Sequence, residues 1–68
     1  MAFRRWHEIK TAPKDGTMIE LMSDRHPGIQ QCMIWDGVRW AGMAFTPMGT
    51  RETFWDPDDP PTHWRPIM

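Results

Sequence analysis

Seven prolines divide this chain into segments that are too short for most helices. They stand at positions 13, 27, 47, 57, 60, 61 and 66 of 68 residues. Proline donates no amide hydrogen bond and restricts the residue before it, so it interrupts helices and central strands alike. Only two proline-free windows are longer than about twelve residues. Both windows are better explained as strands, so the sequence predicts a mainly β domain.

The clearest single strand is predicted over residues 17–23. Ile19 and Leu21 share one face of such a strand, and the residues between them lie on the other face. The turn before it has Pro13 at its second position, where φ is preset, and Gly16 where a positive φ is tolerated. We therefore expect a half-buried strand that begins after a defined turn.

A β-hairpin is predicted around the Asp-Gly pair at positions 36–37, because this pair favours a two-residue turn between strands. With that loop, Trp35 faces Val38 and Met33 faces Trp40. These four side chains then lie on one face, which we assign to the core because it holds two indoles. The opposite, half-exposed face holds Cys32, Ile34, Arg39 and Ala41.

The second half of the chain has a weaker pattern. Residues 46–50 are interpreted as a loop and residues 53–55 as a short strand. The proline-rich residues 56–61 are typical of an extended connector. Residues 62–67 alternate like an edge strand, on which Pro66 would turn its missing donor toward solvent.

These segments predict one small domain over residues 1–68, since a second core would not fit in this length. Its fold class is mainly β, with three to five short strands in an antiparallel sheet that could close as an SH3-like open barrel. Five tryptophans supply large apolar surfaces for so small a core. The predicted core consists of Trp6, Ile19, Leu21, Met33, Trp35, Val38, Trp40 and Trp64.

Charge and cysteine content limit the partners and the cellular location that we expect for this protein. Eight basic and nine acidic side chains give a net charge near −1, which offers no electrostatic reason to expect nucleic acid or an anionic membrane as a partner. Cys32 is the only cysteine, so no intramolecular disulfide can form. No apolar run approaches a signal peptide or a membrane span. We therefore expect a cytoplasmic protein with no membrane partner.

No group of residues matches a catalytic or metal-binding motif. The three histidines and Cys32 lack the close pairwise spacing of a zinc site. The acidic residues 56–59 are interrupted by proline and lack the glycine and final glutamate of a calcium loop. No serine or cysteine stands in a pattern that would activate it as a nucleophile. We expect no metal, no cofactor and no enzymatic activity.

Three short motifs are more specific than the strand pattern. The chain carries W-x-x-I-x-x-A-P-K-D-G-T at residues 6–17, W-D-G at residues 35–37 and P-T-H-W-x-P-I at residues 61–67. In these motifs it resembles a family of short bacterial and phage or prophage proteins, a domain of unknown function. The resemblance implies a compact tryptophan-rich fold and an accessory role, and it implies no catalytic residues.

Two functions remain open at this point. The first is a protein-binding module or inhibitor, because the chain has more methionine and phenylalanine than a minimal core needs. The alternative is a nucleic-acid-binding small β-barrel, because arginine adjoins tryptophan at three places. We expect a protein partner and a monomer or a weak homodimer paired through an edge strand. The candidate binding face comprises Arg39, Phe45, Met48, His63 and Arg65.

Overall fold

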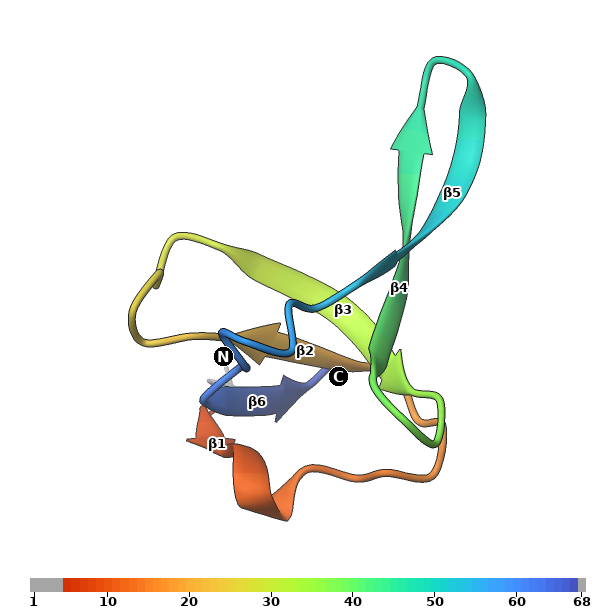
Figure 1. The fold of residues 1–68 in the computed structure, drawn as a ribbon. Helices are drawn as coiled ribbons and strands as arrows, with labels where there is room; N and C mark the ends of the chain where they lie inside the picture. The colour runs from red at the N-terminus through yellow and green to blue at the C-terminus, as the bar shows by residue number, and fades with distance from the viewer. Residues whose placement is uncertain (1–4, 68) are drawn as a thin grey trace.

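The computed structural model describes residues 5–67, which form one open antiparallel sheet (Figure 1). The strands are β1 (His7–Glu8), β2 (Ile19–Met22), β3 (Gln30–Trp35), β4 (Trp40–Thr46), β5 (Gly49–Phe54) and β6 (His63–Pro66). Their order across the sheet is β1-β6-β2-β3-β4-β5. The mainly β prediction is confirmed, although the sheet has one strand more than the three to five expected. A 3-10 helix, Ile9–Thr11, follows β1.

The strand β3 changes its partner along its length. Its Met33 lies opposite Ile19 of β2, whereas Trp35 lies opposite Trp40 of β4. Because the two halves of β3 belong to different pairings, the β4–β5 hairpin stands away from the other four strands (Figure 1). We call this hairpin, residues 40–54, the arm.

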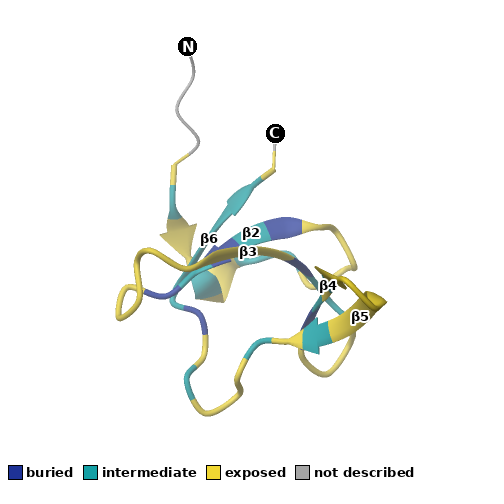
Figure 2. Cartoon of the chain, turned by 90° about the horizontal axis from the view of Figure 1, so that it is seen from above, coloured by how far each residue is buried: buried dark blue, intermediate teal, exposed yellow. Residues whose placement is uncertain are grey.

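The core lies where β2, β3 and β4 meet. Ile19 and Leu21 alternate with half-buried neighbours along β2, as predicted from the period of two. With Met33 and Trp40 they form a buried cluster, and Figure 2 shows buried residues gathered on these strands and few on the arm. Five half-buried side chains pack against the cluster: Ile9, Ala12, Trp35, Trp55 and Trp64.

The loop between β3 and β4 is longer than predicted. Trp35 pairs with Trp40, so four residues, 36–39, form the turn instead of two. The Asp36 Oδ1 atom accepts hydrogen bonds from the backbone N–H groups of Val38 and Arg39, at 2.9 and 2.8 Å. These bonds hold the wider turn. Val38 stands in the turn with 80% of its surface exposed, so its assignment to the core is wrong.

Two further predictions are wrong, one about a strand and one about the core. The strand β6 is not at an edge, because it lies between β1 and β2, with Trp64 paired to His7 on one side and Leu21 on the other. Trp6 is only half buried and lies outside the core cluster. Its ring instead lies under the Arg65 guanidinium, whose central carbon is 4.2 Å from the ring centroid.

The acidic proline segment turns where an extended connector was predicted. The N–H of Asp59 donates to the carbonyl of Asp56 over 3.2 Å, and the Asp56 carboxylate caps the same turn. Trp55 then donates its indole N–H to the Asp59 carbonyl over 2.8 Å. Across the molecule, Arg25 and His26 both contact the Asp59 carboxylate. These contacts fold residues 56–61 back over the core.

The arm is longer and more regular than the sequence indicated. Residues 46–50 are not a loop, because Thr46 pairs with Gly49 and only Pro47 and Met48 connect the two strands. Gly49 follows them with a φ of +121°, a conformation that favours glycine.

No helix within residues 5–67 has the length and apolar character that crossing a membrane requires.

Candidate binding surfaces

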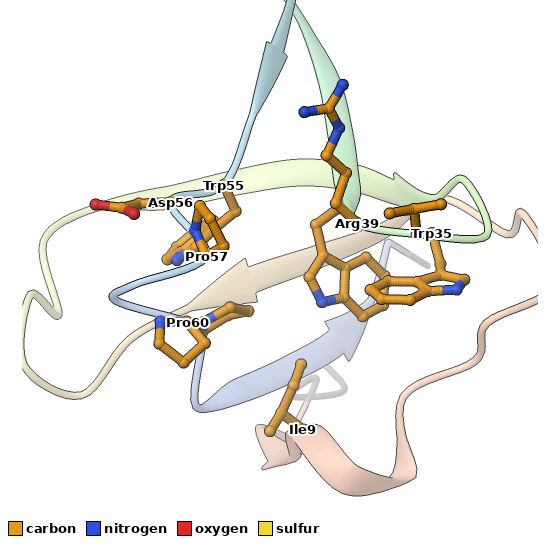
Figure 3. Close-up of a pocket in the computed structure, with 10 residues that line it drawn as sticks. Ile9, Trp35, Arg39, Trp55, Asp56, Pro57 and Pro60 are labelled. Carbon is orange, nitrogen blue, oxygen red and sulfur yellow. The ribbon is translucent and has the colours of Figure 1, made fainter.

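The first candidate surface is a pocket beside the core with a volume of about 300 Å³ (Figure 3). Trp35 and Trp40 form one wall, and Trp55 comes from the segment that leaves the arm. The other walls are Ile9 of the 3-10 helix, Val38 and the prolines Pro57, Pro60 and Pro61. The folded-back proline segment therefore supplies four of the ten residues that line this pocket.

The interior of the pocket is apolar. Arg39 and Asp56 stand at its rim, and Figure 3 shows their charged ends pointing away from the space between the indoles. The Lys14 ammonium lies 4.4 Å from the ring centroid of Trp35. Such a pocket can accept an apolar group, but none of the groups that line it points to a particular ligand.

The second candidate surface is the arm. Side chains alternate along β4, so Met43 and Phe45 lie on the face opposite Trp40. Phe45 is 86% exposed, and Met48 at the tip is 95% exposed. The paired strand β5 adds Phe54 to the same face, where it lies opposite Ala41. Large apolar side chains are thus held away from the core on a two-stranded arm.

The five residues predicted as one binding face do not lie together. Phe45 and Met48 are at the far end of the arm, whereas Arg39 is at its base, with its guanidinium carbon 3.4 Å from the Phe54 ring centroid. His63 and Arg65 belong to β6, from which β4 is separated by two strands.

Arg65 is engaged within the sheet. Its Nε atom donates to Glu20 Oε1 over 2.7 Å, and both side chains are largely covered. His63 has its Nδ1 atom 2.8 Å from the Thr62 hydroxyl. Arg65 therefore joins β6 to β2, whereas His63 contacts only its neighbour in the chain, and Phe45 and Met48 remain as candidates for contact with a partner.

Sequence reasoning missed the outer edge of β5. The N–H of Trp55 donates to the carbonyl of Trp40, and hydrogen-bonded pairs alternate with non-bonded pairs in an antiparallel ladder. It follows that Thr50, Glu52 and Phe54 direct their backbone N–H and C=O groups away from β4. No strand within residues 5–67 pairs with this edge. The β-branched threonines around Arg51 and Glu52 were the available signal.

The titratable groups of residues 5–67 do not gather into a site. No three of the histidine, cysteine and acidic side chains in this range lie close enough together to hold a metal ion. His26 contacts Asp59 over 3.0 Å, and the His63 Nδ1 atom contacts the Thr62 hydroxyl over 2.8 Å. Cys32 is exposed on β3.

No protein-family model matches the chain, and no similar protein was found among curated proteins or solved structures. The resemblance of its three motifs to a phage and prophage family therefore stays a prediction.

Proposed function

We propose that this chain is a small accessory protein that acts by binding another protein, as a module or as an inhibitor. The observation that carries the proposal is the arm, which presents Phe45 and Met48 almost fully to solvent. A side chain of this size stabilises a fold most when it is buried. Two of them at a projecting tip leave apolar surface exposed to water in the free protein. Contact with a partner protein would recover that surface, because phenylalanine and methionine are enriched in the centres of interfaces.

The net charge of −1 and the family resemblance agree with this role. A protein of phage or prophage type that works inside a bacterial cell would meet its partner in the cytoplasm. We also propose that the sheet curls into an SH3-like open barrel. It is supported by the return of β6 to the side of β2 and by the change of partner along β3.

The alternative of nucleic-acid binding has weaker support. It rests on arginines beside tryptophans, and such a site needs cations that are available to phosphate groups. Arg65 is already paired with Glu20 and stacked on Trp6, while Arg39 is stacked on Phe54. Arg39 also stands at the rim of the indole pocket, but its guanidinium points away from the space between the indoles.

The test is affinity purification of the tagged protein from a bacterial lysate, with and without nuclease, followed by mass spectrometry. A double variant, Phe45→Ser with Met48→Ser, removes the apolar tip. We expect a stoichiometric protein that survives nuclease to be recovered with the parent and to be lost with this variant.

Val38→Ser is the matched control, because Val38 is also apolar and 80% exposed but stands in the turn before β4, away from the tip. It should retain the partner. Recovery of the same proteins with the parent and the tip variant would contradict the proposal. Recovery of nucleic acid alone, lost on nuclease treatment, would favour the alternative.

A further inference from the structure

We infer that the outer edge of β5 is the pairing site for an extended segment of the partner protein, which adds a strand antiparallel to β5. This segment carries a basic residue opposite Glu52 and an acidic residue opposite Arg51. The inference rests on the proposed function and adds to it the place of contact and the chemistry of the partner.

The backbone of β5 is suited to such pairing. Thr50, Glu52 and Phe54 direct their N–H and C=O groups away from β4. An incoming strand can therefore form hydrogen bonds with three of the six residues of β5. Main-chain hydrogen bonds of this kind supply affinity in strand addition, and the alternating side chains supply specificity. These outward-directed N–H and C=O groups are therefore the part of the site that the backbone provides, and side chains provide the rest.

A second copy of this chain fits the edge poorly. Two identical antiparallel edges are related by a two-fold axis perpendicular to the sheet, so paired residue numbers must sum to an even number if paired side chains are to share a face. The two registers that pair most of β5 then place Arg51 opposite Arg51 or Glu52 opposite Glu52. Like charges directly opposite each other destabilise a strand pair. The register that would join Arg51 to Glu52 has an odd sum and is excluded.

A strand from a different protein is not bound by this symmetry, so its register with β5 is not limited to even sums. A single extended segment can rotate about its own axis, so it can place a basic side chain opposite Glu52 and the next, acidic, side chain opposite Arg51. Both residues of β5 are exposed, and neither forms an ion pair within residues 5–67. The charges therefore disfavour self-pairing and favour a segment with adjacent basic and acidic residues.

The apolar side chains of the arm extend the same site. Phe54 lies on the face of Glu52, next to the end of the added strand, and Phe45 and Met43 follow on β4. Apolar residues on that face of the segment would cover these side chains. An extended segment with the order apolar-Thr-basic-acidic-apolar therefore matches β5 position by position from Phe54 to Thr50.

The probe is a synthetic peptide, Val-Thr-Lys-Glu-Val-Thr, with both ends blocked, titrated into the isotopically labelled full chain and followed by amide NMR. The control peptide, Val-Thr-Glu-Lys-Val-Thr, has the same composition with the two charges exchanged. We expect the amide signals of Thr50, Glu52 and Phe54 to shift, and the first peptide to bind about fivefold or more tightly than the second. The protein variant Arg51→Glu with Glu52→Arg should reverse this preference.

Binding of both peptides with equal affinity, shifts confined to other residues, or no binding would each overturn the edge site. The proposed function would still stand if the lysate partner is captured and depends on Phe45 and Met48. Loss of that capture would contradict the proposed function whatever the peptides do, so the two results are separable.

Discussion

Trp35 and Trp40 lie directly opposite each other across the β3–β4 hairpin, with ring centroids 5.2 Å apart and ring planes at 70°. This edge-to-face geometry is worth about 0.5–1.5 kcal/mol beyond the burial of the rings. The pair closes the hairpin and forms a wall of the apolar pocket. The junction between the sheet and the arm therefore depends on these two indoles.

The substitution Trp40→Ala should lower the free energy of unfolding by about 3–5 kcal/mol, because Trp40 is one of the four residues of the buried cluster. In a domain of this length that loss is close to the whole stability. Val38→Ala in the same hairpin should change it by less than about 0.5 kcal/mol. Urea denaturation followed by tryptophan fluorescence or circular dichroism measures both, and equal losses would contradict the placement of the core.

The β3–β4 hairpin also shows which part of the strand register can be predicted from the sequence. An Asp-Gly pair predicts a turn, but the Asp36 carboxylate bonds to two N–H groups and stabilises a loop that is two residues longer. Because two is an even number, the faces of Met33, Trp35 and Trp40 are unchanged. Val38 is misplaced because it moves from the strand into the turn. The lengths of turns are decided by such side-chain bonds, which composition does not reveal.

Most of the arm was missed for a different reason. Predicting a strand from alternation requires one face to be buried, and almost every residue of β5 is exposed. The pattern along Ile19–Met22 was recognised because that strand does have a buried face. The pocket also escaped prediction, because it forms only when residues 56–61 fold back and bring Pro60 near Trp55.

The substitution Gly42→Ala should lower stability by about 1–3 kcal/mol. A Cβ atom at Gly42 would lie 3.0 Å from the Met33 Cγ atom and 3.1 Å from the Cys32 carbonyl oxygen. The backbone oxygen cannot move without shifting β3. Gly28→Ala is the control, because nothing lies within 4 Å of a Cβ there. Thermal unfolding of the two variants should separate them, and equal melting temperatures would contradict the close contact of β3 and β4.

Acid should weaken the fold partly through two turn carboxylates. The N–H groups of Arg39 and Val38 hold the pKa of Asp36 below its ordinary value of 3.8, and the Thr17 side chain and N–H do the same for the pKa of Asp15. Groups with lowered pKa values in the folded state stabilise it above their ordinary value, and this stabilisation is lost as the pH falls through the lowered pKa.

We therefore expect the urea midpoint of the parent to fall more steeply between about pH 5 and pH 2 than that of Asp36→Asn or Asp15→Asn. Asparagine keeps the acceptor oxygen but does not titrate. The double variant should be the least sensitive to acid, because the two turns are independent. Parallel curves for all four proteins would show that these carboxylates do not contribute to acid unfolding.

The charges on β5 should determine whether the chain pairs with itself. Glu52→Val removes the repulsion from the register that places position 52 opposite itself, and it adds a residue that favours strands. Thr50→Val is the matched control, because it adds the same side chain to the same face and keeps Glu52. Sedimentation velocity over a range of concentrations should show Glu52→Val dimerising at concentrations where Thr50→Val and the parent remain monomeric. Equal self-association of the two variants would mean that added apolar surface, and not the loss of a like charge, drives pairing, and the argument for a charged partner strand would then fail.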